Sequence, residues 1–197
     1  MSNSSVCPLF RGKVIFYQIK HDFKNFEKSL AEAEKLNDKA YSILILNSIK
    51  AFSIDRNPLE ALHYLKKAKG VSKGDYTWLY NKAFIYMYLE KFDLGLKNYK
   101  KLRNISFANE ESTVNQCIAF NENLLQEEPN KKQSLFILGY LYYTKKNNFP
   151  IALEKFEQFI QETKNIKKYD YLRTRAKTYI GEIKKEMQLD EDDKNKT

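Results

Sequence analysis

The stretch that decides the fold is residues 138–156, LGYLYYTKKNNFPIALEKF. Two apolar segments flank a short polar link, NNFP, whose Asn and Pro residues are typical of the end of one helix and the start of the next. Gly139 lies in the middle of the first segment, although glycine in a helix interior costs about 1 kcal/mol relative to alanine. We therefore expect Gly139 to lie where two helices approach closely, so that packing offsets this cost.

Helical periodicity extends along nearly the whole chain and predicts an all-α fold. Asp, Asn and Pro mark the links between the periodic segments, and links this short favour antiparallel packing of neighbouring helices. We expect about ten helices, near 10–20, 23–37, 39–53, 58–69, 75–90, 92–103, 110–127, 132–146, 149–163 and 168–187.

The composition is that of a folded protein without a membrane-spanning segment. The chain has 197 residues, of which 43% are hydrophobic and 30% charged, with only six Gly and four Pro. No window approaches the ~20 apolar residues that span a bilayer. The N-terminus lacks a secretory pattern, and the two cysteines are too few for a disulfide framework. We expect a cytoplasmic protein that does not contact membranes.

The net charge of +9 comes almost entirely from lysine, since the chain has only five arginines. A protein that reads phosphates or guanines with bidentate contacts would be expected to use more arginine. The basic balance is therefore attributed mostly to composition, and a protein partner is favoured over nucleic acid.

A repeated pattern appears when the second helix of each expected hairpin is aligned on a small or apolar inner residue. Phe26, Ala61, Gly95 and Ala152 take that position, and they are separated by 35, 34 and 57 residues. A bulky residue follows each of them four positions later, and a second inner residue three positions after that. These followers are Leu30 and Ala33, Leu65 and Ala68, Tyr99 and Leu102, and Phe156 and Phe159. Two of the intervals match a helical-hairpin repeat of about 34 residues.

The pattern resembles the tetratricopeptide repeat (TPR) family. Leu138–Gly139 with Tyr142, then Ala152 with Phe156, match its Leu–small–aromatic and Ala–aromatic positions, and Pro129 matches the proline that closes a preceding repeat. The resemblance covers residues 129–160 well and 77–102 in part, while Leu135 stands where the family usually has Trp. It implies an α-solenoid of antiparallel hairpins that binds proteins in a concave groove, without catalysis.

The longer interval of 57 residues contains an amphipathic segment near 110–127, which we expect to form a lone irregular helix. The segment at 168–187 is expected to form a C-terminal capping helix with a polar outer face. We thus predict an N-terminal tail over 1–9, a single repeat domain over 10–188 with a possible bend at 104–130, and a disordered charged tail over 189–197.

The resemblance also implies the groove residues, because the first helix of each repeat lines the concave surface in this family. The matching positions are Tyr80, Asn81, Phe84, Met87, Phe136, Tyr140 and Tyr143. Phe136 and Tyr140 replace the polar groups that family members use to bind carboxylates, so apolar side chains of a peptide or helix are the expected ligands. The alternative is that these aromatic residues fill the core between helices.

A second candidate surface is a basic patch on the last helix, a possible contact for RNA or an acidic partner. Its residues are Lys168, Arg173, Arg175, Lys177, Lys184 and Lys185.

The sequence contains no recognisable catalytic or cofactor motif. Gly70 and Gly74 fit no nucleotide-binding loop, and His21 and His63 fit no metal motif. Cys117 is expected to be a buried small residue. The sequence thus predicts a non-catalytic adaptor that binds a protein or peptide and has no metal or cofactor. An RNA-binding repeat and a regulatory subunit of an enzyme complex are the alternatives.

Overall fold

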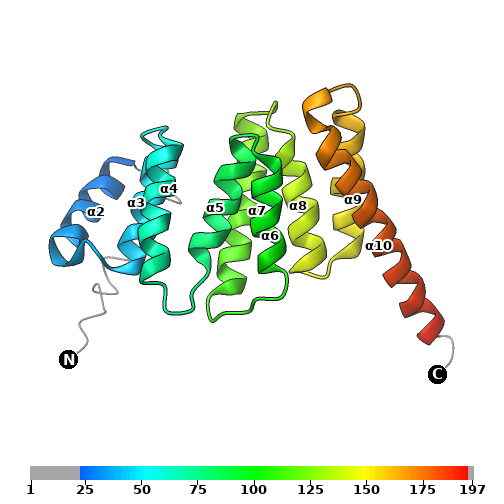
Figure 1. Cartoon of the computed structure of the whole chain (residues 1–197), viewed down its shortest axis with the longest axis horizontal. Helices are drawn as coiled ribbons and strands as arrows, with labels where there is room; N and C mark the ends of the chain where they lie inside the picture. The colour runs from blue at the N-terminus through cyan, green and yellow to red at the C-terminus, as the bar shows by residue number, and fades with distance from the viewer. Residues whose placement is uncertain (1–22, 195–197) are drawn as a thin grey trace. The chain divides into compact units, whose positions relative to one another are not determined.

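The computed structural model describes residues 23–194, with side chains from Lys24 to Gln188. This part of the chain is all-helical, with no strand among its residues (Figure 1). Its elements are α2 (Phe23–Asn37), α3 (Tyr41–Ser53), α4 (Pro58–Gly70), α5 (Thr77–Tyr88), α6 (Phe92–Leu102), α7 (Glu110–Glu127), α8 (Gln133–Thr144), α9 (Phe149–Glu162), the 3-10 helix η1 (Lys167–Tyr169) and α10 (Asp170–Lys194). The prediction of an all-α protein is confirmed over this range.

The predicted helices agree closely with these bounds, and the segment at 110–127 does form one helix, α7. The helix expected at 10–20 and the tail expected at 1–9 lie outside the described residues. At the other end, α10 continues to Lys194 and so runs into the segment where a tail was expected from residue 189.

The chain divides into two compact units, and the boundary falls inside α5, between Ile85 and Tyr86. Among the described residues, unit 1 comprises Phe23–Ile85 together with Ser106–Asn109, and unit 2 comprises Tyr86–Ile105 and Glu110–Lys194. Each unit has its own packed interior. The single repeat domain and its bend at 104–130 stay predictions.

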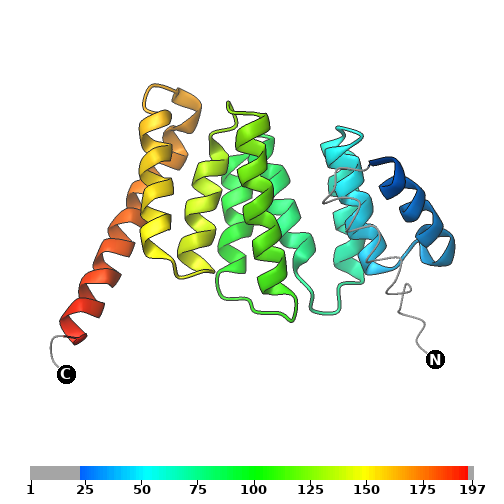
Figure 2. The ribbon, with the colours of Figure 1, turned by 180° about the vertical axis from the view of Figure 1, so that it is seen from behind.

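In unit 1, α3 packs against both α2 and α4 (Figure 1). Phe26, Leu30 and Ala33 from α2 form a core with Ile43 and Leu46 from α3. In unit 2, α8 lies between α7 and α9, and α10 packs against both α8 and α9 (Figure 2). Ten of the twelve residues of α8 are buried, which makes this helix the centre of the unit.

The links inside the helical hairpins share one construction. Arg56, Glu90 and Asn147 each have a positive φ, between 48° and 60°, and each directly precedes the N-cap of the next helix. These three residues are separated by 34 and 57 residues, the same intervals as the inner residues of α4, α6 and α9. The Asn57 and Asn148 side chains cap α4 and α9 by accepting from the backbone N–H of Glu60 and Ile151. Such caps fix where each second helix begins.

The expected close contact at Gly139 is present. A Cβ atom at this position would lie 2.8 Å from the Phe156 ring of α9. Gly95 of α6 has the same role against Met87 of α5, where a Cβ atom would lie 2.6 Å from the Met87 side chain. Both glycines are therefore packing residues that let the two helices of a hairpin approach closely. All the inner residues aligned in the sequence, from Phe26 to Phe159, are buried.

A candidate anion-binding pocket

The residues expected to line an aromatic groove belong instead to the packed interior. Tyr80, Met87, Phe136, Tyr140 and Tyr143 are at most 2% exposed. Phe84 is also buried and Asn81 is half-buried. The exposed groove is thus corrected in favour of the alternative that these rings fill the core.

The physical reason is that α8 is surrounded on all sides. The Phe136 ring lies 5.6 Å from that of Phe156 and 5.7 Å from that of Phe159, so it packs into α9. Tyr140 packs against Tyr179 of α10 at 5.4 Å between ring centroids. In unit 1, Phe84 packs edge-on against Phe52 at 5.4 Å. A helix that is apolar all round is usually buried, as the sequence alternative required.

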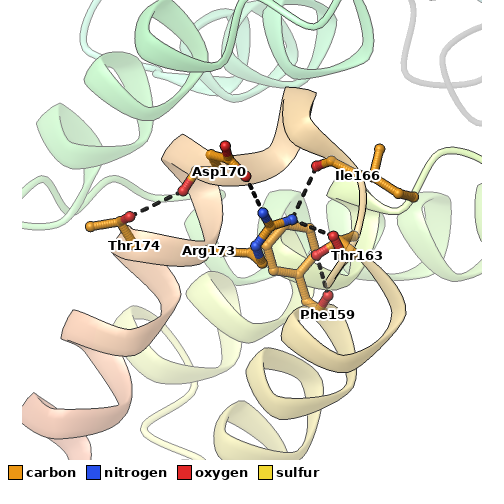
Figure 3. Close-up of polar contacts among 6 residues, drawn as sticks. All are labelled: Phe159, Thr163, Ile166, Asp170, Arg173 and Thr174. Carbon is orange, nitrogen blue, oxygen red and sulfur yellow. Dashed lines mark hydrogen bonds and ion pairs between the residues drawn. The ribbon is translucent and has the colours of Figure 1, made fainter.

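The predicted basic patch is likewise not one continuous surface, because Arg173 is turned inward (Figure 3). Its guanidinium donates to the backbone carbonyls of Thr163 and Ile166 and pairs with the Asp170 carboxylate. The Thr163 hydroxyl donates in turn to the Phe159 carbonyl at 2.6 Å. Arg173 therefore ties the end of α9 to the start of α10, and its donors are used within the fold.

The other members of the patch differ from one another. Lys168 forms an ion pair with Glu90, and the Lys184 Nζ lies 4.0 Å from a Glu157 carboxylate oxygen. Lys177 and Lys185 are exposed to solvent. Arg175 lies over the Tyr171 ring at 5.5 Å and has no carboxylate partner among the described residues. Arg175 also lines a pocket.

That pocket lies in unit 2 and has a volume of about 280 Å³. Its lining residues come from α6, α8, α10 and the residue that follows α6. They are Lys100, Arg103, Tyr140, Arg175, Thr178, Tyr179 and Glu182. We call this the cationic pocket, because three cations and one carboxylate leave it a formal excess of two positive charges.

Two tyrosine hydroxyls in the cationic pocket are buried without a hydrogen-bond partner within the described residues, namely those of Tyr140 and Tyr179. The side chains are 2% and 5% exposed. Burial raises the pKa of Tyr179 to about 12, and it also raises the pKa of Tyr140. Both phenols are therefore neutral donors at pH 7. A buried hydroxyl without a partner usually costs 1–3 kcal/mol, so a native structure that keeps two of them in one pocket calls for an explanation.

Arg103 is held at the pocket by Tyr143 and two glutamates. Its guanidinium donates to the Tyr143 hydroxyl at 3.2 Å and lies 3.8 Å from the Glu182 carboxylate. The Tyr143 hydroxyl donates to Glu186 at 2.7 Å, and Glu182 lies 3.2 Å from the same hydroxyl. Arg103 is thus partly neutralised, whereas Lys100 and Arg175 have no carboxylate partner in the part of the chain that the structure describes.

A second hollow in unit 2 has different electrostatics. It has a volume of about 340 Å³ and is lined by Glu110, Glu111, Val114, Lys145 and Lys146. Lys145 pairs with Glu110 at 2.7 Å, and Lys146 lies 3.8 Å from Glu111. The charges of this hollow neutralise one another, so it does not share the positive excess of the cationic pocket.

The sequence identified only Tyr140 and Arg175 among the residues of the cationic pocket. Lys100 and Arg103 were missed because Lys100 lies on the second helix of a hairpin and Arg103 directly follows that helix, whereas the resemblance placed ligands on first helices. Tyr179 lies at an apolar position of the last helix, and helical periodicity gives no sign that its hydroxyl lacks a partner.

The described residues contain no group of three or more His, Cys, Asp and Glu side chains that could hold a metal ion. Cys117 is buried as expected, and burial raises the pKa of its thiol to about 12. None of the helices within residues 23–194 has the length and apolarity that crossing a membrane requires. No protein-family model matches the chain, and a comparison with curated proteins found no similar sequence.

Proposed function

We propose that this chain is a non-catalytic interaction module of the TPR type, acting in the cytoplasm, and that its cationic pocket receives an acidic group of a partner protein. The observation that carries the proposal is that Lys100, Arg103 and Arg175 line one pocket together with two tyrosines whose buried hydroxyls have no partner within the described residues. Pockets that bind ligands combine a mostly apolar wall with a few converging polar groups.

A repeat architecture is supported by the shared construction of the hairpin links. The positive-φ residues Arg56, Glu90 and Asn147 recur at the same intervals as the inner residues of the helices that follow them. Two glycines, Gly95 and Gly139, allow the same kind of close helix approach in two hairpins. A helical-repeat scaffold of this kind commonly presents a surface for protein partners.

An acidic protein group suits the pocket better than an RNA backbone does. RNA and DNA binding relies on several phosphate contacts distributed over an extended basic surface. Here Arg173 and Lys168 are engaged within the fold, and Arg175 contributes to a single pocket of about 280 Å³. The arrangement therefore favours one acidic group over a polynucleotide.

The test is an affinity capture in which this protein is the bait and a lysate of the cells that naturally contain it supplies the partner. The wild type is compared with two single variants. Arg175→Gln removes one unpaired cation of the pocket. Lys177→Gln, on the same helix and exposed, removes one charge outside the pocket. We expect Arg175→Gln to lose the captured protein and Lys177→Gln to retain it, as read by quantitative mass spectrometry.

Equal loss in the two variants would contradict the pocket and indicate a general effect of charge. Capture of RNA that disappears steeply with rising salt would support the nucleic-acid alternative instead.

A further inference from the structure

The cationic pocket carries more positive charge and more donors than one carboxylate can use, which allows its ligand to be specified further. This step rests on the function proposed above and concerns the chemical class of the acidic group. We infer that the pocket takes a phosphate monoester dianion carried by a phosphorylated residue of the partner protein.

The charge of the pocket is the first reason. Lys100, Arg103 and Arg175 with Glu182 leave an excess of two positive charges. A phosphorylated side chain carries about −1.5 to −2 charges at pH 7, whereas an Asp or Glu side chain carries −1. A phosphate monoester therefore matches the excess, and a single carboxylate leaves part of it uncompensated.

The donors are the second reason. The residues that line the pocket carry two guanidinium groups, one ammonium group and two neutral phenol hydroxyls. Arginine recognises phosphate through paired, charge-assisted N–H donors, and a phosphate group offers three strongly accepting oxygens. The two phenol hydroxyls would then gain the acceptors that they lack within the fold. A carboxylate has only two oxygens to share among these groups.

The rigidity of the wall is the third reason. The Tyr179 ring stacks on Phe156 at 5.7 Å and contacts Tyr140 edge-on at 5.4 Å. The Tyr143 hydroxyl holds Arg103 at 3.2 Å. Because these groups are fixed by packing before a ligand arrives, little side-chain freedom is lost on binding.

Glu182 gives the proposal an internal test, because its carboxylate repels any anion that enters. Its repulsion is reduced by Arg103 at 3.8 Å. Glu182→Gln removes this repulsion, and it also removes the carboxylate that partly offsets the charge of Arg103. We therefore expect this variant to bind phosphate severalfold more tightly than the wild type does.

The binding experiment uses the five arginines of the chain as reporters, since each contributes one side-chain Nε–H resonance in a ¹⁵N NMR spectrum. The wild type is titrated with inorganic phosphate, with a short phosphoserine peptide and with acetate, at constant ionic strength. We expect the Arg103 and Arg175 signals to move with both phosphate probes and the Arg173 signal to stay. The phosphoserine peptide should bind more tightly than inorganic phosphate if the source is a protein.

Variants and pH then separate phosphate from carboxylate. Arg175→Gln should weaken phosphoserine binding at least tenfold, Tyr140→Phe about threefold, and Lys177→Gln less than twofold.

The affinity for the phosphoserine peptide should rise from pH 5.5 to pH 7.5 as the monoester loses its second proton near pH 6, while acetate affinity should stay level. The charged and titratable groups facing the ligand are Lys100 and Arg103 from the α6 side, Tyr140 from α8, and Arg175, Tyr179 and Glu182 from α10. Residues 86–105 and 110–197, which make up unit 2, include no histidine, so this unit contributes no imidazole to the pH dependence.

The closing experiment repeats the partner capture after the lysate has been treated with a phosphatase. Loss of the Arg175-dependent partner after treatment supports the inference. Retention of that partner, still sensitive to Arg175→Gln, overturns the phosphate class while the proposed function stands. Acetate and phosphate binding of equal strength at pH 7.5 overturns it in the same way. Capture that Arg175→Gln and Lys177→Gln leave equally strong overturns the proposed function itself.

Discussion

Arg173 and Arg175 lie two residues apart on α10 and have different environments. Arg173 donates to two backbone carbonyls and pairs with Asp170, so its charge is used inside the fold. Arg175 has no carboxylate partner among the described residues and lines the cationic pocket. Neighbours on α8 show the same contrast, because Gly139 packs on Phe156 while Tyr140 lines the pocket. A cluster of like residues in a sequence therefore does not define a site, and the difference lies in which donors remain unused.

The largest effect is expected at the closed contact between α8 and α9. Gly139→Leu would place a branched side chain where even a Cβ atom lies 2.8 Å from the Phe156 ring. Overpacking of this kind costs typically ~1–3 kcal/mol, and here two helices must separate. We expect the free energy of unfolding to fall by about 3 kcal/mol, measured by urea denaturation.

Gly139→Ala is the matched control for this prediction, and it should cost less because it adds one methyl group to the contact with Phe156 where leucine adds a branched side chain. A melting temperature of Gly139→Leu equal to that of the wild type would show that α8 and α9 are not in close contact there.

The next effect separates the two arginines directly. Arg173→Gln removes charge-assisted bonds to the Thr163 and Ile166 carbonyls, and hydrogen bonds to charged groups are worth about 1.5–3 kcal/mol. We expect it to lower the free energy of unfolding by about 2 kcal/mol. Arg175→Gln should leave that free energy within about 0.5 kcal/mol, as surface substitutions usually do.

Thermal unfolding followed by circular dichroism measures both arginine variants under one set of conditions. If the two substitutions lower the free energy of unfolding equally, Arg173 is not engaged within the fold more than Arg175 is, and the distinction between them is wrong.

Helix positions could be predicted from the sequence because they depend on local signals. The Asn caps at Asn57 and Asn148 and the periodic apolar residues fix the start and the buried face of a helix within a few residues. The close contact at Gly139 was also predictable, since the small residue and its aromatic partner Phe156 recur in a fixed pattern.

The cationic pocket could not be predicted in the same way, because its residues come from helices about 40 and 75 positions apart in the chain. Periodicity says that Tyr140 and Tyr179 face inward, but it does not say which hydroxyl finds an acceptor. The prediction of an aromatic groove was wrong for the same reason. Apolar residues on every side of α8 are compatible both with a helix that lines a groove and with a helix in the core. Only the packing of α7, α9 and α10 around α8 decides between them.

The smallest effect concerns the pocket tyrosines at alkaline pH. Burial raises the pKa of Tyr179 from its ordinary value of 10.0 to about 12, so the folded state keeps the phenol neutral where the unfolded state ionises it. The contribution of the neutral Tyr179 phenol to the free energy of unfolding is fully present below pH 10 and is lost as the pH rises from 10 through 12.

Tyr179→Phe retains the ring contacts and removes the titrating group. We expect the wild type and this variant to lose stability differently between pH 9 and pH 11. The variant should retain more of its free energy of unfolding at pH 11, by about 1 kcal/mol, because one pKa unit corresponds to 1.36 kcal/mol and the other tyrosines titrate alike in both proteins. Urea denaturation at the two pH values measures this difference. Equal losses in the two proteins would mean that solvent already reaches the Tyr179 hydroxyl, and the pocket would then lack one of the two buried donors on which its ligand was inferred.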